Sequence, residues 1–235
     1  MIFLRSLAFN VAFAALTLAL AVVGLPVFLG PRAWAYRLGC LWAGACMKLL
    51  RWIVGLRWEV RGTPPPGPAL VVAKHQSAWE TLALTLLLKE PAFVLKRSLL
   101  WAPPYGPYLR KAGMIAIDRT GGAGAIRQMR AAAAAALARG QSVVIFPEGT
   151  RTAPGAPPAY LPGVAALYRG LEAPIWPVAV NSGVYWGRNA FAKRPGAVVI
   201  AFLEPIPPGL DRRAFMARLE DAIETSTRAL VEEAE

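Results

Sequence analysis

Apolar runs divide this chain of 235 residues into two parts with different patterns. Near the N-terminus, residues 6–31 contain no charged side chain, and Arg5 and Arg32 flank them. A second apolar segment, Trp34–Trp58, interleaves tryptophan and tyrosine with arginine and lysine. Beyond residue 68, short apolar runs alternate with longer segments of helical periodicity, which is typical of an α/β domain.

The two N-terminal segments together predict a membrane anchor made of two helices. The first segment exceeds the length of about 20 apolar residues that a helix needs to cross a hydrocarbon core. Pro26 and Pro31 predict a bend after it. Mixed aromatic and basic side chains in the second segment suit the headgroup region of a bilayer. A basic residue before an apolar run also resembles a signal peptide, but the second segment favours an anchor. The pattern leaves open whether the first helix spans the bilayer or lies in one leaflet.

A proline-rich stretch at residues 63–68 separates this anchor from the rest of the chain and is typical of a stiff linker. We therefore predict membrane-anchoring helices over residues 1–60 and an α/β domain over residues 61–235. The predicted strands cover residues 69–73, 92–95, 114–117, 142–146, 175–180 and 197–203. The predicted helices cover residues 77–89, 105–111, 124–139 and 162–171, and a last helix follows Asp211 as its N-cap. The alternation predicts a mostly parallel sheet flanked by helices.

Composition and charge narrow the choice of partner. The chain is 56% hydrophobic and only 17% charged, which is more apolar than an ordinary soluble domain, and its formal net charge is +12. Such a basic balance indicates either nucleic acid or an anionic membrane surface. Because the sequence has no zinc-finger spacing and no RNA-binding signature, we expect an anionic membrane surface and no nucleic acid. Cys40 and Cys46 both lie in apolar sequence and are interpreted as small buried residues, which favours a domain facing the cytoplasm over a secreted one.

Polar side chains follow four of the predicted strands, directly at their C-terminal ends. Because the C-terminal ends of parallel strands share one edge of a sheet, where ligands bind, we expect these side chains to meet at one crevice. His75 is the only histidine of the chain, and imidazole is the usual side chain for proton transfer near neutral pH. The residues at the four strand ends are Lys74 and His75, Lys96 and Arg97, Asp118 and Arg119, and residues 147–151.

Four motifs in this order resemble those of the glycerolipid acyltransferases, specifically the 1-acylglycerol-3-phosphate acyltransferases. The resemblance spans residues 65–185, and the sequence departs from the usual pattern at three positions. Glutamate replaces the usual aspartate at Glu80, Lys74 stands where asparagine is common, and Leu161 stands where many relatives carry lysine. The four motifs are His75 and Glu80 with four residues between them, Gly113–Arg119, Phe146–Arg151 and Ile175–Val178.

The resemblance implies transfer of an acyl chain from a thioester donor, acyl-CoA or acyl-carrier protein, to the sn-2 hydroxyl of 1-acylglycerol-3-phosphate. The product would be phosphatidic acid, and neither a metal nor a bound organic cofactor is expected. In this family pattern His75 is the general base, and Glu80 holds its other ring nitrogen. The remaining expected site residues are Arg151, Arg119, Lys96 and Arg97 on the substrate phosphate, and Glu148, Gly149 and Thr150 as substrate-positioning residues.

Several residue roles have a second reading. Ser77-Ala78-Trp79-Glu80 also fits a helix capping box, with Ser77 as N-cap and Glu80 reaching back to it. The pair of His75 and Glu80 works only if His75 lies in the turn before the helix. Arg119 could instead form an internal salt bridge, and Glu148 could orient Arg151 or bind a glycerol hydroxyl. Ser77 is disfavoured as a nucleophile because the sequence lacks the Gly-x-Ser-x-Gly elbow.

Other functions stay open beside the favoured one. The acceptor could be another lysolipid, such as a lyso-ornithine lipid, or the chain could be a non-catalytic basic membrane-binding protein or a serine hydrolase of lipids. For the favoured function we expect the inner cell membrane as location, with the catalytic domain on the cytoplasmic face.

Overall fold

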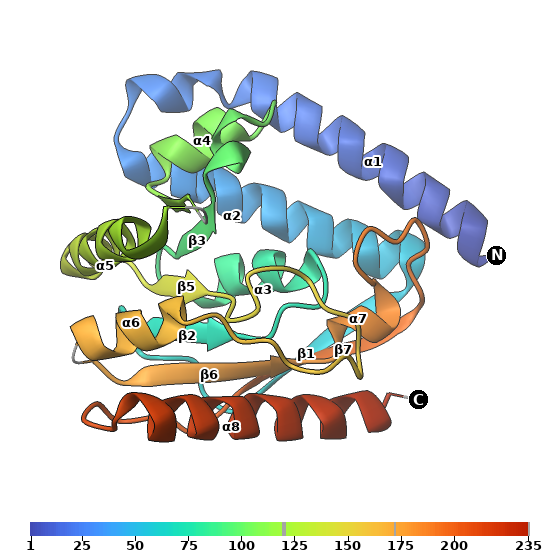
Figure 1. The fold of residues 1–235 in the computed structure, drawn as a ribbon. Coiled ribbons are helices and arrows are strands. Elements are labelled where there is room, and N and C mark those ends of the chain that lie inside the picture. The colour runs from blue at the N-terminus through green and yellow to red at the C-terminus, as the bar shows by residue number, and fades with distance from the viewer. Residues whose placement is uncertain (119–120, 172, 235) are drawn as a thin grey trace.

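A mixed sheet with helices on both faces forms the centre of the computed structural model, which describes residues 1–118, 121–171 and 173–234 (Figure 1). Among these residues the strand order is β1-β7-β6-β2-β5-β3-β4, and every neighbouring pair is parallel except β6 and β7. The prediction of a mostly parallel α/β sheet is therefore confirmed. The strands are β1 (Leu56–Arg61), β2 (Leu70–Ala73), β3 (Ala92–Lys96), β4 (Ile115–Ile117), β5 (Val143–Ile145), β6 (Ile175–Val180) and β7 (Gly196–Phe202).

Strand β2 lies in the middle of the sheet, and its side chains alternate between two separate hydrophobic cores. Val71 and Ala73 pack with residues of α2 and α3 on one face, whereas Leu70 and Val72 pack with residues of α5, α6 and α8 on the other. A strand covered on both faces is apolar without interruption, which explains the run before Lys74. The helices are α2 (Arg32–Leu49), α3 (Trp79–Leu87), α5 (Gly122–Ala138), α6 (Gly163–Leu171) and α8 (Arg212–Glu232).

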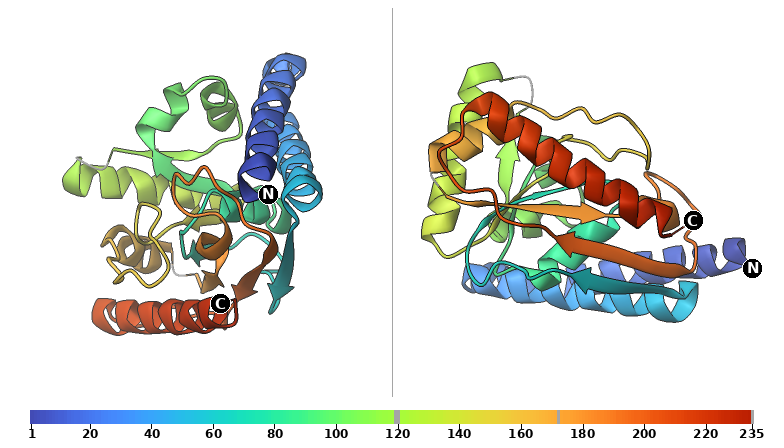
Figure 2. Two further views of the ribbon diagram at one scale, coloured as in Figure 1. Left: turned by 90° about the vertical axis from the view of Figure 1, so that its right-hand side faces the viewer. Right: turned by 90° about the horizontal axis from the view of Figure 1, so that it is seen from below.

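The two predicted N-terminal helices are present as α1 (Ile2–Val23) and α2, joined by the 3-10 helix η1 (Leu25–Leu29). Figure 2 shows this pair on one side of the sheet and α8 on the other. Among the described residues, α1 alone is long and apolar enough to cross a membrane. It is mostly exposed, with Ser6 and Phe9 as its buried residues. Helix α2 instead packs against α3, so one of the two helices has the character of a membrane span and the other belongs to the body of the domain.

The second apolar segment differs from its prediction in its last part. The helix ends at the π-helical turn η2 (Leu50–Val54), and Gly55 follows with a φ of 83°, a left-handed conformation that suits glycine and ends the helix. Strand β1 then pairs in parallel with β7 at the edge of the sheet. Trp58 contacts Trp79 with ring centroids 6.0 Å apart, so this tryptophan packs on the domain. The predicted boundary at residue 60 falls inside β1, and the division of the chain there remains a prediction.

The remaining elements confirm most of the predicted positions. Helix α8 begins after Asp211, whose side chain accepts hydrogen bonds from the backbone N–H groups of Arg213 and Ala214. Both cysteines are free thiols, Cys46 buried and Cys40 half-buried. The short elements are η3 (Arg97–Trp101), α4 (Gly106–Lys111) and α7 (Ser182–Tyr185).

Candidate active site

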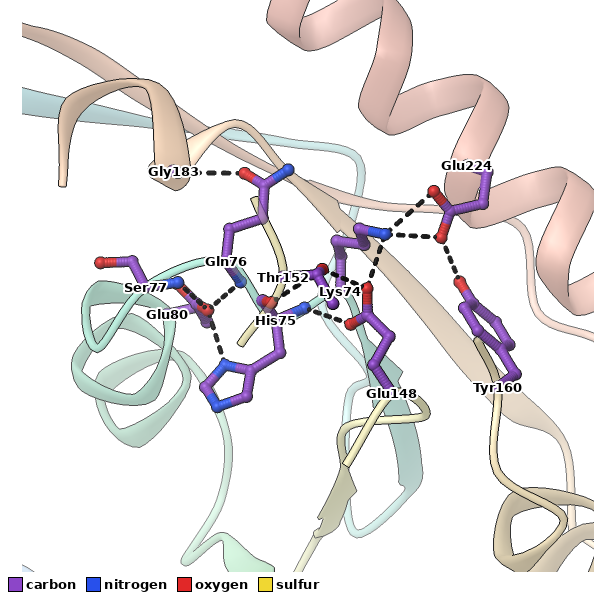
Figure 3. A network of polar contacts seen from close by, with 10 residues as sticks. All are labelled: Lys74, His75, Gln76, Ser77, Glu80, Glu148, Thr152, Tyr160, Gly183 and Glu224. Carbon is purple, nitrogen blue, oxygen red and sulfur yellow. Dashed lines mark hydrogen bonds and ion pairs between the residues drawn. The ribbon is translucent and has the colours of Figure 1, made fainter. Parts of the chain in front are cut away.

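His75 lies in the turn between β2 and α3, the position that its pairing with Glu80 requires. Its ring nitrogen Nδ1 is 2.7 Å from Oε1 of Glu80. The imidazole stacks on the ring of Phe146, with centroids 3.8 Å apart and an interplanar angle of 13°. The second ring nitrogen, Nε2, points away from Glu80 (Figure 3). A carboxylate on one nitrogen and a stacked ring on one face hold the imidazole in one orientation, with the other nitrogen available for a substrate.

Glu80 combines the two roles that the sequence left open. Its Oε1 also accepts hydrogen bonds from the backbone N–H groups of Gln76 and Ser77, each at 2.7 Å, as a capping residue would. Its Oε2 accepts a hydrogen bond of 2.7 Å from the hydroxyl of Ser182, at the start of α7. The side chain is fully buried, with 0% exposure. A buried carboxylate needs such donors to be stable, and here they also fix its position against His75.

The helix cap itself differs from the predicted capping box. Helix α3 begins at Trp79 with Ala78 as its N-cap, and the hydroxyl of Ser77 accepts a hydrogen bond of 3.2 Å from the backbone N–H of Trp79. Ser77 is completely buried. Its hydroxyl is used in the helix start, which agrees with the expectation that Ser77 is no nucleophile.

Glu148, in the turn after β5, contacts other partners than those expected. Its Oε2 accepts a hydrogen bond of 3.0 Å from the backbone N–H of His75, and its Oε1 accepts one of 2.6 Å from the hydroxyl of Thr152. The ammonium of Lys74 lies 2.6 Å from the same Oε1. These three protein groups contact both oxygens of the carboxylate, so Glu148 orients His75 and Thr152 in this structure. The sequence pattern predicts Arg151 or a glycerol hydroxyl as its partner instead.

A largely apolar cavity of about 850 Å³ lies beside His75. It extends between the N-terminal helices and the body of the domain, so that α1 and α2 form one wall and α4 and α5 contribute to another. The predicted convergence of strand ends is confirmed for four residues that line this cavity, one at or just beyond the C-terminal end of each of β2, β3, β4 and β5: His75, Lys96, Asp118 and Gly149.

The lining of the cavity does not include the expected phosphate-binding residues Arg97 and Arg151. Arg97 is exposed at the start of η3. Arg151 is half-buried, and its guanidinium donates one hydrogen bond of 3.2 Å to the side-chain oxygen of Asn189. Thr150, between Gly149 and Arg151, is exposed. Arg119 lies outside the described residues.

Comparison with known proteins shows the family to which this chain belongs. A sequence model of the family described as Acyltransferase matches residues 57–181, more than half of the chain. The chain belongs to the acyltransferase family. The resemblance drawn from the four motifs is therefore confirmed at the level of the family.

The relatives of this acyltransferase carry a more specific name. The chain is 37% identical over 161 residues to a 1-acyl-sn-glycerol-3-phosphate acyltransferase of Pseudomonas aeruginosa, with 68% of this chain and 63% of that protein covered. It is 35% identical over 173 residues to the human 1-acyl-sn-glycerol-3-phosphate acyltransferase alpha, covering 68% of this chain and 61% of the human protein. The chain thus spans somewhat less than two thirds of the length of these relatives.

The fold of the acyltransferase agrees with that of a solved structure. The crystal structure of the 1-acyl-sn-glycerophosphate acyltransferase PlsC from Thermotoga maritima superposes with a TM-score of 0.76. The match covers 97% of this chain and 95% of that one at 20% sequence identity, so the N-terminal helices are part of the shared fold.

The structure adds residues that sequence reasoning missed. Ser182 follows Asn181 at the C-terminal end of β6, so the strand-end rule applied once more would have identified it. In the sequence Phe146 is only the first residue of the third motif, and no pattern there predicts that its ring stacks on His75. Glu224 lies in the middle of α8, and its contact with Lys74 has no local sequence signal.

Proposed function

We propose that this acyltransferase moves an acyl chain from a thioester donor to the sn-2 hydroxyl of 1-acylglycerol-3-phosphate and so makes phosphatidic acid. The observation that carries the proposal is the contact of His75 with buried Glu80 beside an apolar cavity. The names of the relatives from Pseudomonas aeruginosa and human support the choice of acceptor.

In the proposed reaction His75 is the general base. Nε2 takes the proton of the acceptor hydroxyl while the hydroxyl oxygen attacks the carbonyl carbon of the thioester. The imidazolium then gives that proton to the departing thiolate. Glu80 accepts the Nδ1–H hydrogen bond, which fixes the tautomer and stabilises the imidazolium. General-base help of this kind contributes about 10²–10⁴-fold to a rate. Direct transfer between acceptor and thioester needs no acyl-enzyme, in agreement with the buried position of Ser77.

The cavity offers a place for an acyl chain. Its walls are mainly hydrocarbon, from residues such as Phe13, Leu20 and Met129. Each methylene buried there contributes about 0.8 kcal/mol. The proposed phosphate ligands are Lys96, on the cavity wall, and the arginines Arg151, Arg97 and Arg119. A guanidinium has five N–H donors, so the hydrogen bond of Arg151 to Asn189 leaves capacity for a phosphate.

Gly149, on the cavity wall, and Thr150 directly precede Arg151 in the chain and are proposed to position the glycerol part of the acceptor. Acyl-CoA or acyl-carrier protein serves as donor in this proposal, and neither metal nor organic cofactor takes part. Because both donors are intracellular thioesters, we place the catalytic domain on the cytoplasmic face of the inner membrane, with α1 in the bilayer and residues 1–60 as the anchoring part.

The proposal is tested with purified protein, both kinds of acyl thioester, and a panel of lysolipids that includes lysophosphatidic acid and a lyso-ornithine lipid. We expect phosphatidic acid from the wild type and a loss on the order of 10³-fold for His75→Ala. Preference for lyso-ornithine lipid would move the function to another acceptor. Lipid binding without turnover, equal in wild type and His75→Ala, would contradict enzyme function altogether. A covalent acyl group trapped on Ser77 would favour a serine hydrolase.

A further inference from the structure

Lys74 is a buried charge that the proposed chemistry does not use. It stands next to His75 at the end of β2, yet the two side chains point in opposite directions, as consecutive residues of an extended chain do (Figure 3). His75 lines the cavity, whereas Lys74 extends toward α8 and is only 2% exposed. Lysine is almost never buried to this degree unless it is paired, so its partners indicate why it is here.

The first partner of Lys74 is Glu148, which contacts the backbone of the active-site turn. The ammonium lies 2.6 Å from Oε1 of Glu148, whose other oxygen accepts the backbone N–H of His75 at 3.0 Å. Thr152 adds a second link between the two turns. Its hydroxyl donates a hydrogen bond to Glu148, and its backbone N–H donates a hydrogen bond of 2.8 Å to the carbonyl of His75. His75 is therefore held by its N–H and its carbonyl to the turn after β5, which also carries Arg151.

The second partner of Lys74 is Glu224, in the middle of the C-terminal helix. The ammonium lies 2.8 Å and 2.9 Å from the two oxygens of this carboxylate. The hydroxyl of Tyr160 donates a third hydrogen bond to Glu224 at 2.8 Å. Burial and the neighbouring carboxylate raise the pKa of Tyr160 above its ordinary value, which keeps the hydroxyl protonated as a donor. The contacts link α8 and the loop before α6 to the strand end that carries His75.

Lys74 is the shared cation between two carboxylates in this network. Without it, two acidic side chains would face each other in an interior that weakens like-charge repulsion far less than water does. Oε1 of Glu148 would then keep only the hydroxyl of Thr152 of its two partners, while Oε2 carries the hydrogen bond to His75. A charge change at Lys74 therefore acts on the position of His75 through one intermediate side chain.

We propose that Lys74 is a positioning residue of this enzyme, which holds Glu148 against the backbone of His75 and is itself anchored on α8 by Glu224. The inference rests on the proposed function, since the reaction gives His75 its task. An error in placement of about 1 Å lowers a rate on the order of 10²-fold. Lys74→Met keeps the length of the side chain and removes its charge, so it is the variant of choice.

Two measurements on the whole chain of 235 residues in detergent micelles test this inference. We expect Lys74→Met to lower kcat by about 10–100-fold while KM for acceptor and donor changes little. Labelling with nitrogen-15 histidine reports on a single imidazole, because His75 is the only histidine. Its signals should shift in Lys74→Met. The matched control is Lys89→Met, which removes an exposed lysine just beyond α3 and should leave kcat and signals unchanged.

The second variant is Glu224→Gln, which keeps the pair of Lys74 and Glu148 and should fold even if Lys74→Met does not. We expect a smaller loss of kcat and a shift of the His75 signals in the same direction. Its control is Glu232→Gln, exposed on the same helix. A folded Lys74→Met or Glu224→Gln protein with wild-type kcat and unshifted signals would overturn the proposal, even if its melting temperature fell. If the wild type transfers no acyl group, the proposed function fails, and the histidine signals still test the position of His75.

Discussion

At the scale of single residues, Glu80 shows how one side chain serves the helix and the site together. It sits in the first turn of α3 and reaches back to two backbone N–H groups and to His75. These donors and the hydroxyl of Ser182 surround both oxygens. Because the side chain is fully buried, its two oxygens need this complete set of donors. The same contacts that start the helix also determine the orientation of the imidazole.

Glu80→Gln should lower kcat on the order of 10²–10⁴-fold, because a neutral amide stabilises an imidazolium poorly and can present the wrong group to Nδ1. The Gln side chain has the same length, so the fold should persist. Steady-state rates with circular dichroism of the same sample check this. Activity within a factor of two of wild type would show that the carboxylate has only its structural role.

Tyr160→Phe should destabilise the protein by about 1.5–3 kcal/mol, the usual contribution of a hydrogen bond to a charged group. The hydroxyl donates to Glu224, and its raised pKa means that the bond persists well into the alkaline range. Urea unfolding at pH 7 and at pH 9 measures the free energy of unfolding. The difference between the two proteins should be the same at both pH values, and a difference that vanished at pH 9 would contradict this assignment.

At the scale of elements, the sequence indicated some parts of the fold clearly and others poorly. Strands such as β2 and β5 are buried on both faces, so their sequences are unbroken apolar runs between turn residues. Strand β1 was missed because its Trp58 resembled an interfacial anchor, whereas it packs on Trp79. In the site, residues beside strand ends were predictable, since topology brings them together. Glu224 was not, because its contact with Lys74 joins positions 150 residues apart.

Gly62→Ala should destabilise the protein by roughly 1–3 kcal/mol or more. Gly62 follows β1 with a φ of 69°, and a Cβ there would collide with the carbonyl oxygen of Phe202 in β7. Gly67→Ala is the control, because a Cβ at that glycine meets no atom within 4 Å. Denaturant unfolding of the two variants compares them directly. Equal stability would show that β1 contributes little to the sheet.

At the scale of the whole molecule, the exposed surface of α1 and the basic charge of the chain point to a lipid surface. Helix α1 leaves large apolar side chains exposed along its length, among them Val11, Leu18 and Val22. The chain as a whole carries a net charge of +12. An exposed apolar helix on a basic protein suits a bilayer that contains anionic lipids. We therefore expect α1 and the total charge to act together in any binding to a membrane.

Val11→Asp should weaken binding to vesicles of phosphatidylethanolamine and phosphatidylglycerol by about 70–400-fold, since an aspartate in a membrane-embedded helix costs roughly 2.5–3.5 kcal/mol. Val11 is 61% exposed, so the protein should still fold. Ala217→Asp introduces the same residue at an exposed position of α8 and serves as control. Cosedimentation with vesicles measures both. Equal binding of the two variants would place the lipid contact elsewhere than on α1.

The contribution of α1 to the cavity wall matters for any shortened form of this protein. Phe13, Thr17, Leu20 and Ala21 of α1 line the cavity from one side. Cutting off the first two dozen residues, a common route to a soluble preparation, would therefore open the interior beside His75 to solvent. Such a shortened protein would not report the acyl-chain preference of the intact cavity, even if it eluted as a single species in size-exclusion chromatography.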